Sequence, residues 1–156
     1  MTPCRTGIGV AAPGPRRRIV VIGSGGTGKT TLAAAIADRL WLPQVELDAL
    51  YWGPNWTGAG GSPEGDALFR SRIAEATSGG AWVVDGNYTS VARGLLWPQA
   101  DTIVWLDYSL PFTFWRLLRR TLRRMVRREV LWGTNRESFA VSFLSKKSIL
   151  LWVLKT

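Results

Sequence analysis

The sequence predicts a three-layer α/β/α fold with a parallel sheet between two layers of helices. Three observations lead to this prediction. Four short, largely apolar runs occur at 18–22, 45–47, 82–84 and 102–106, and such runs are typical of strands buried on both faces. Segments with apolar residues at helical spacing separate them. Each run ends at a glycine or an aspartate, at the sheet edge where α/β proteins bind ligands.

Four helices are expected between and after these strands. The first ends at Leu42-Pro43, because proline disfavours helix in the residue before it. The second begins at Ser62-Pro63, with the serine as its N-cap, and Pro111 opens the long fourth helix. The expected helices cover 29–40, 63 to the glycine pair at 79–80, 90–96 and 111–128, and residues 137–154 are expected to start as a helix and continue as an apolar run.

Composition limits the chemistry that this chain can perform. The 156 residues suit one domain. Cys4 is the only cysteine, which excludes an internal disulfide, and the absence of histidine excludes histidine bases and ligands. A metal must therefore sit on oxygen ligands, which favours magnesium. The net charge of +9 makes nucleic acid, anionic membranes and phosphorylated molecules candidate partners.

The two ends of the chain carry separate expectations. Residues 1–16 are rich in Gly, Pro and Ala and are expected to be a disordered leader or an overlong predicted start. Residues 17–156 are expected to form a single nucleotide-binding domain, with a C-terminal truncation as one interpretation. The sequence lacks a stretch of about 20 apolar residues, so a cytoplasmic protein is the default expectation.

The strongest motif follows the first predicted strand and matches G-x-x-x-x-G-K-[ST] in full. Its glycines allow backbone N–H groups to point at phosphate oxygens, and the next helix adds its positive N-terminal end. Lys29 is expected to reach the β- and γ-phosphates of ATP, and Thr30 to bind Mg²⁺. The alternative is a glycine-rich turn with a solvated lysine. The predicted ATP-binding residues are Gly23, Ser24, Gly25, Gly26, Thr27, Gly28, Lys29, Thr30 and Thr31.

Aspartates at the other strand ends complete the predicted site. Asp85 is expected to hold Mg²⁺ together with Thr30, with a turn or capping role as the alternative. Asp48 is expected to orient an attacking hydroxyl or accept its proton, and a turn role is equally compatible with its position. We interpret Asp107 as a cap before the long helix.

The glycine-rich loop at 51–63 carries three aromatic residues that could wall an acceptor pocket. These are Tyr51, Trp52 and Trp56. The chain contains nine tryptophans, however, and most of them must pack. Acceptor binding and simple packing therefore both remain open for this loop.

The long helix carries seven arginines between residues 116 and 128. An apolar stripe at spacings of three and four predicts that one side packs and the other is cationic; it consists of Trp115, Leu118, Leu122 and Met125. Arg116 and Arg120, with Arg119 as a further candidate, are expected to stabilise the transferring phosphoryl group. The later arginines are open to binding phosphates of nucleic acid or a lipid surface.

These motifs together resemble small P-loop kinases of the adenylate kinase and shikimate kinase type. The chain is most similar to bacterial adenylate-kinase-related topology modulation proteins, which are also labelled AAA-family ATPases. The segments that carry the resemblance are RIVVIGSGGTGKTTLA, LDALYW, WVVDGNY, ADTIVWLD and the arginine run. It implies a five-stranded parallel sheet, ATP with Mg²⁺, and an arginine-bearing lid.

The resemblance also implies an acceptor site and shows two departures. Asp85-Gly86 matches the start of the adenylate kinase D-G-F-P-R element, but Asn87-Tyr88 replaces Phe-Pro and Arg93 is the nearest arginine. This departs from what an AMP acceptor would require. A fifth strand is not evident after the fourth. The implied substrate-binding residues are Asp48, Tyr51, Trp52, Gly86, Tyr88 and Arg93.

Three functions fit these observations. The first is a kinase that transfers the γ-phosphoryl group of ATP to a small acceptor, with a nucleotide as one candidate acceptor. Its predicted catalytic residues are Lys29, Asp48, Arg116 and Arg120. The second is an ATP-dependent regulator that binds nucleic acid through the arginine helix. The third is a shortened chain that folds but turns over poorly.

Overall fold

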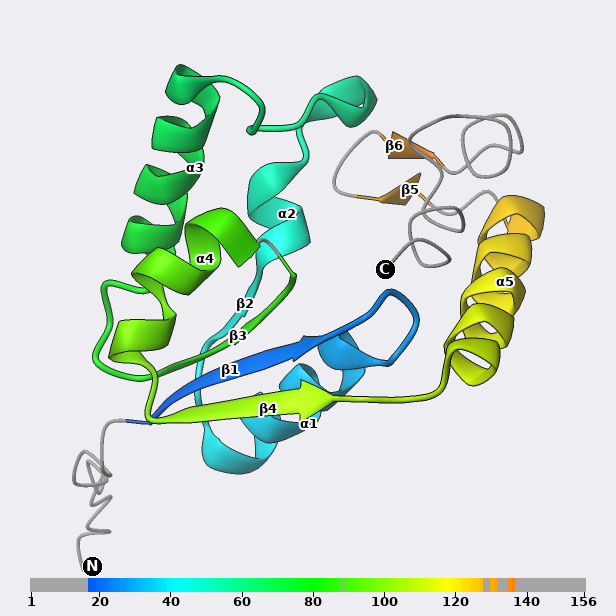
Figure 1. The fold of residues 1–156 in the computed structure, drawn as a ribbon, viewed down its shortest axis with the longest axis horizontal. Helices are drawn as coiled ribbons and strands as arrows, with labels where there is room; N and C mark the ends of the chain where they lie inside the picture. The colour runs from blue at the N-terminus through cyan, green and yellow to red at the C-terminus, as the bar shows by residue number, and fades with distance from the viewer. Residues whose placement is uncertain (1–16, 88, 128–129, 132–134, 137–156) are drawn as a thin grey trace, which may run out of the picture.

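A parallel sheet forms the centre of the computed structural model, which describes residues 17–87, 89–127, 130–131 and 135–136 (Figure 1). Its strands are β1 (Arg18–Gly23), β2 (Gln44–Glu46), β3 (Trp82–Asp85) and β4 (Thr102–Leu106). They pair in parallel in the order β2-β3-β1-β4. This order places β1 and the loop that follows it between β3 and β4.

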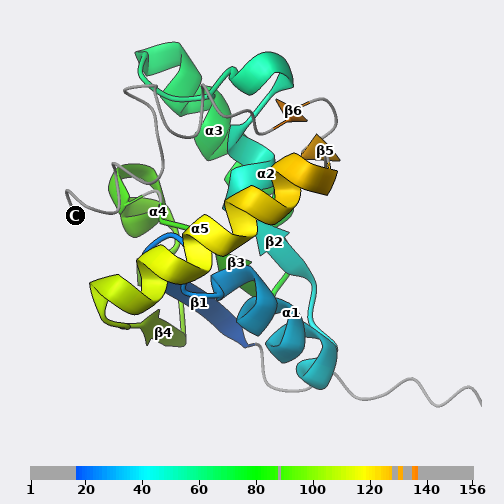
Figure 2. The same cartoon turned by 90° about the vertical axis from the view of Figure 1, so that its right-hand side faces the viewer.

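Helices cover both faces of this sheet, and one long helix lies beyond its carboxyl edge (Figures 1 and 2). Helix α1 packs on one face, whereas α3 and α4 pack on the other. A two-stranded antiparallel pair follows α5. The remaining elements are α1 (Lys29–Leu40), α2 (Leu47–Tyr51), η1 (Pro54–Trp56), α3 (Pro63–Ala76), α4 (Thr89–Leu95), η2 (Trp97–Gln99), α5 (Leu110–Arg127), β5 (Val130–Leu131) and β6 (Asn135–Arg136).

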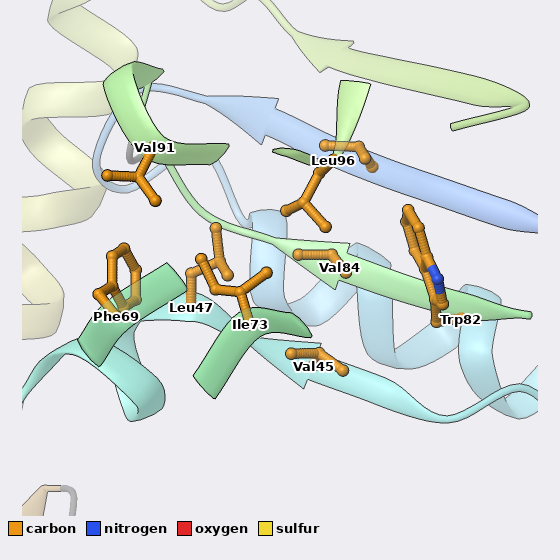
Figure 3. Close-up of a cluster of buried hydrophobic side chains, with 9 residues drawn as sticks. Val45, Leu47, Phe69, Ile73, Trp82, Val84, Val91 and Leu96 are labelled. Atoms are coloured by element: carbon orange, nitrogen blue, oxygen red, sulfur yellow. The ribbon is translucent and has the colours of Figure 1, made fainter. Parts of the chain in front are cut away.

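Two apolar clusters hold the layers together. Figure 3 shows the larger one, which contains Trp82 and Val84 of β3 and Phe69 and Ile73 of α3. Ala33 and Ala37 of α1 pack on the opposite face of the sheet. Full burial of one such large apolar side chain contributes about 1.5–3 kcal/mol. These clusters therefore provide a rigid base for the strand ends.

Most of the predicted elements are confirmed. The helix at 29–40 and the strand at 102–106 have the predicted bounds. Ser62 caps α3 by accepting a hydrogen bond from the backbone N–H of Gly65 at 3.1 Å, and Pro63 begins the helix. The three-layer α/β fold with a parallel sheet is thus confirmed.

Three local predictions differ from the structure. The second strand ends at Glu46, so Asp48 lies in the first turn of α2 rather than after a strand. Helix α5 begins at Leu110, so Ser109 flanks its start and Asp107 does not cap it. Strand β4 is not buried on both faces: Ile103 and Trp105 are 42% and 68% exposed. The reason is that β4 lies at the edge of the described sheet.

The packing prediction for the arginine helix was wrong in part, since only Leu118 of the predicted stripe is half-buried and packs against Leu117 among the side chains described. Trp115 and Leu122 of the predicted packed stripe are 65% and 45% exposed, whereas Thr113, Leu117 and Thr121 are completely buried. The Thr113 hydroxyl tolerates burial because it donates to the backbone carbonyl of Ser109 at 2.9 Å. Helix α5 approaches a glycine-rich loop and not a sheet face, and Thr113 and Leu117 form the contact with Gly26.

Some predictions fall outside the described residues. These concern the leader at 1–16, Tyr88, and the C-terminal segment at 137–154; for Met125, only the backbone is described. Among the described residues, every helix is too short or too polar to cross a membrane.

Candidate functional site at the carboxyl edge of the sheet

Two glycines with positive φ angles shape the loop between β1 and α1. Gly26 and Gly28 adopt φ angles of 85° and 94°, which glycine adopts without the strain that other residues incur. The Thr27 hydroxyl donates to the carbonyl of Ser24 at 2.8 Å and closes the turn. The Lys29 ammonium donates to the same carbonyl at 2.9 Å, so its charge lies over the loop.

Thr30 and Asp85 come together across the sheet edge. The Thr30 hydroxyl donates to Oδ1 of Asp85 at 2.9 Å. Asp85 is 2% exposed, although it ends a strand and carries a carboxylate. A hydroxyl and a carboxylate in contact supply oxygen ligands of the kind that Mg²⁺ prefers. The predicted metal residues are therefore adjacent in space.

Charged groups from four elements lie near one another around Lys29. Burial lowers the pKa of the Lys29 ammonium, which Asp48 and Asp85 oppose and Arg120 reinforces. Burial likewise raises the pKa of Asp85. Helix α1, helix α2, strand β3 and helix α5 thus each place one charged side chain within electrostatic range of the same point. Both pKa shifts place Lys29 and Asp85 in a partly dehydrated environment.

Helix α5 approaches the loop closely enough to exclude side chains from it. A Cβ atom at Gly26 would lie 2.9 Å from the carbonyl oxygen of Thr113 and 3.1 Å from Cβ of Leu117. A Cβ atom at Gly28 would lie 3.3 Å from Nη2 of Arg116. Figure 2 shows α5 passing across the loop after β1. The first half of the arginine helix therefore lies against the loop, as its predicted role requires.

Replacing Gly26 with alanine is expected to destabilise the protein by about 1–3 kcal/mol, because it adds a Cβ at a positive φ and against a backbone oxygen. Chemical unfolding of both proteins measures this difference. Gly94 in α4 provides a matched control, since a Cβ there meets no atom within 4 Å. Gly94→Ala should stabilise by about 0.5–1 kcal/mol. Equal effects from the two variants would contradict the close contact.

The aromatic side chains of the 51–63 loop pack against one another. The Tyr51 ring lies 4.9 Å from the Trp52 ring and 5.2 Å from the Phe69 ring, in both cases edge to face. Trp52 also meets Trp56, with 5.5 Å between ring centroids. Gly58 lies directly against the Tyr51 ring, where a Cβ would come within 2.7 Å. These contacts show that the three aromatic residues pack against one another, and acceptor binding by them stays a prediction.

The other predicted substrate residues are distributed around β3 and α4. Gly86 follows β3 with a φ of 144°, and a Cβ there would come within 2.7 Å of Leu47. Arg93 is exposed and lies 4.6 Å above the ring of Trp97. The structure thus places Gly86 beside Asp85, whereas Arg93 stacks on a neighbouring aromatic ring.

Three polar residues that hold the site or the neighbouring 51–63 loop were not predicted. Gln44 donates to the other carboxylate oxygen of Asp85 at 3.1 Å. Asn87 accepts the N–H of Gly23 at 3.2 Å and so ties the loop to β3. Asn135, 1% exposed, accepts from the N–H of Trp56 at 2.8 Å and donates to the carbonyl of Gly53 at 2.9 Å. Only Asn87 had a signal in the sequence, namely its place directly after Asp85-Gly86.

Comparison with known proteins identifies the fold. No protein-family model and no curated protein matches the sequence. A shikimate kinase from Bacteroides thetaiotaomicron superposes with a TM-score of 0.58 at 18% identity, over 89% of this chain and 76% of that one. A gluconokinase from Sinorhizobium meliloti 1021 gives 0.54 at 22% identity, over 90% and 75%.

A third solved structure, a sugar kinase from Janibacter sp. HTCC2649, gives a TM-score of 0.53 at 22% identity, over 91% of this chain and 78% of that one. At these identities the likeness concerns the fold. The chain therefore has the α/β fold of small P-loop kinases, with its glycine-rich loop, Thr30 and Asp85 at the carboxyl edge of the sheet.

Proposed function

We propose that this chain is an ATP-dependent phosphotransferase that transfers the γ-phosphoryl group to a small acceptor. The observation that carries the proposal is the convergence around Lys29, where Asp48, Asp85 and Arg120 all influence the pKa of its ammonium. A lysine, two carboxylates and an arginine beside a glycine-rich loop match the needs of phosphoryl transfer, which are positioning and charge stabilisation. The kinase fold of the similar structures supports this function.

In this proposal the loop amides and Lys29 hold the phosphates, and Thr30 and Asp85 hold Mg²⁺. The hydroxyl and the carboxylate are in contact at 2.9 Å, so their oxygens are close enough to bind one ion. Bound magnesium would neutralise charge that develops on the phosphate oxygens. Arg116 of α5 lies beside Gly28, where its guanidinium would stabilise the same charge on the phosphate oxygens.

Asp48 is the residue proposed to act on the hydroxyl group of the acceptor. It lies at the start of α2, close enough to Lys29 and Asp85 to affect the pKa of both. In the reaction the acceptor oxygen bonds to the γ-phosphorus, the bond from that phosphorus to the β,γ-bridging oxygen breaks, and the hydroxyl proton passes to Asp48. ADP and the phosphorylated acceptor are the products.

The resemblance to adenylate-kinase-related topology modulation proteins makes a nucleotide one acceptor to test. By that resemblance Gly86, Tyr88 and Arg93 would contact it, with Tyr51 and Trp52 bordering the site. The similar solved structures are a shikimate kinase, a gluconokinase and a sugar kinase, so hydroxyl acceptors belong in the same panel. The test is ADP release from Mg·ATP with nucleoside monophosphates and small polyols. A folded full-length chain that no acceptor stimulates would overturn the proposal.

Replacing Asp85 with asparagine is expected to raise the Mg²⁺ concentration that half-saturates the effect on ADP binding about 100-fold. The reason is that a charged metal ligand contributes several kcal/mol. Titration calorimetry of ADP at varied Mg²⁺ measures this effect. Asparagine has nearly the same shape as aspartate. Its amide can accept from Gln44 and donate to Thr30, so the fold should persist.

The same variant makes a prediction about pH. Burial raises the pKa of Asp85, so the fold disfavours the charged carboxylate relative to the unfolded chain. The associated stability is present below the ordinary pKa of 3.8 and is lost as the pH rises through the raised value. Without Mg²⁺, Asp85→Asn should therefore raise Tm near neutral pH, and the gain should shrink as the pH falls toward 3.8. A lower Tm at neutral pH would contradict this assignment.

One observation supports a second candidate function, ATP-dependent binding of nucleic acid. Arg119 and Arg123 of α5 are exposed, so they are accessible to phosphates of a large partner. Such binding would weaken steeply with added salt, because each neutralised phosphate releases counterions. DNA binding that shows this dependence, together with ADP release that no acceptor stimulates, would favour this function over the kinase.

A further inference from the structure

Gln44 contacts both halves of the proposed magnesium site. Its Nε2 donates to Oδ2 of Asp85 at 3.1 Å and lies 3.3 Å from the backbone carbonyl of Thr30. One amide group thus bridges strand β3 and the first turn of helix α1. Gln44 belongs to neither element, since it begins β2.

The sheet explains why this glutamine reaches the site. Gln44 pairs with Val83, and Glu46 pairs with Asp85, in the parallel register of β2 and β3. Side chains alternate between the faces of a strand, and Val45 belongs to the cluster on the α3 face. Gln44 and Asp85 therefore lie on the opposite face, where α1 packs. The first turn of α1, with Thr30, covers that face directly.

The chemistry of the two contacts determines the orientation of the amide. Both partners of Gln44 are oxygen atoms that accept hydrogen bonds. The nitrogen must face them, because the flipped amide would bring its own oxygen against a carboxylate. Both amide hydrogens are then used, one by each partner. The side chain therefore holds Asp85 and Thr30 in a defined relative position.

The two oxygens of the Asp85 carboxylate have different hydrogen-bond partners. Oδ2 accepts from Gln44, and Oδ1 accepts from Thr30. Donation to a carboxylate stabilises its charged form. Although burial raises the pKa of Asp85, the hydrogen bonds from Gln44 and then Thr30 oppose this shift. Gln44 thus favours the ionised carboxylate while leaving Oδ1 directed at the Thr30 hydroxyl.

We propose that Gln44 is a positioning residue for magnesium, which orients the Asp85 carboxylate and fixes it relative to Thr30. The inference rests on the proposed function, in which these two residues hold the ion. Gln44 itself does not coordinate the ion in this proposal, because the atom that faces Asp85 and Thr30 is the amide nitrogen, which is not a ligand for Mg²⁺. Residues that orient metal ligands in this way typically change metal affinity or activity about 10- to 100-fold when they are replaced.

The experiment compares ADP affinity with and without Mg²⁺ in the full chain and in Gln44→Met. Methionine keeps a similar length and volume but removes the donor. The expected result is a Mg²⁺ half-saturation concentration raised about 10-fold or more, with ADP affinity unchanged when Mg²⁺ is absent. The second value separates positioning from damage to the fold, because disruption of the phosphate loop would weaken ADP binding in both conditions.

Gln99 supplies the matched control. It is an exposed glutamine whose Nε2 donates to the carbonyl of Leu95 at 2.7 Å, outside the site. Gln99→Met should leave both ADP affinities unchanged. Gln44→Asn, which keeps the amide but shortens the side chain by one methylene, should resemble Gln44→Met, because the donor no longer reaches Asp85.

The outcomes distinguish this inference from the proposed function. If Mg²⁺ tightens ADP binding in the original chain and Gln44→Met has the same Mg²⁺ dependence, the positioning role is overturned and the magnesium site stands. If Mg²⁺ has no effect on the original chain, the magnesium site and the positioning role fall together. Weaker ADP binding by Gln44→Met in the absence of Mg²⁺ would show a structural role and would also overturn the inference.

Discussion

Replacing Lys29 with methionine is expected to lower the acceptor-stimulated rate on the order of 1,000-fold, because the variant lacks the ammonium that stabilises the transferring phosphoryl group. The ammonium lies over the phosphate loop, donating to Ser24 at 2.9 Å. Burial lowers its pKa, while the nearby Asp48 and Asp85 oppose that shift. A dehydrated positive charge acts more strongly on a phosphate than an exposed one would.

Initial rates of ADP release from Mg·ATP measure this effect. Methionine keeps an unbranched side chain and removes the charge together with the hydrogen bond to Ser24. The glycines that shape the loop are unchanged, so the loop should keep its geometry. Because burial disfavours the ammonium, Lys29→Met should not lower the free energy of unfolding in the absence of nucleotide. A rate within about 10-fold of that of the original chain would show that Lys29 does not stabilise the transition state.

Replacing Arg120 with alanine is the second change with a large expected effect. We expect a decrease in kcat on the order of 1,000-fold, the lower range for an arginine that stabilises a transferring phosphoryl group. ATP affinity should change little, because the interaction forms chiefly in the transition state. Arg120 is half-buried on α5 and lies near enough to Lys29 to affect the pKa of its ammonium. Steady-state kinetics separate kcat from the affinity for ATP.

Arg123 provides the control for this variant. It lies three residues further along the same helix and is exposed. Arg123→Ala removes the same charge from the chain, so it has the same effect on net charge and on helix repulsion. Arg123→Ala should leave kcat nearly unchanged. Equal losses in the two variants would show that α5 acts through its overall charge and not through a specific arginine.

The fold could be predicted because local patterns and tertiary packing agree at most positions. The β-branched strand at 18–22, the Ser62 cap and the strand that ends at Asp85 each carry signals that depend only on neighbouring residues. The phosphate loop is likewise contiguous in sequence. Its geometry follows from glycines and from the helix that begins directly after it.

The orientation of α5 could not be predicted in the same way. Periodicity shows that a helix has an apolar stripe, but it does not show which face meets the rest of the protein. Trp115 is exposed and Leu117 is buried because α5 packs against the loop that contains Gly26. The helix contacts this loop through the side that carries Leu117. The sequence signal for this contact is divided between segments about 90 residues apart.

The polar contacts of the site share this limitation. Gln44 has no motif around it, and its importance arises from a parallel register that places it diagonally from Asp85. Asn135 holds the loop at Gly53 and Trp56 from a distant part of the chain. Single glutamines and asparagines are common surface residues, so only their contacts distinguish these two.

The most direct test of a single phosphoryl-transfer site is the affinity for ADP with Mg²⁺ and fluoroaluminate, which imitates the transferring phosphoryl group. Calorimetry would compare this affinity with that for Mg·ADP alone in the original chain, Lys29→Met and Arg120→Ala. The proposed site predicts that fluoroaluminate tightens binding at least about 100-fold in the original chain and much less in either variant. No tightening in the original chain, or full tightening in both variants, would contradict the convergence of Lys29 and Arg120 on one transition state.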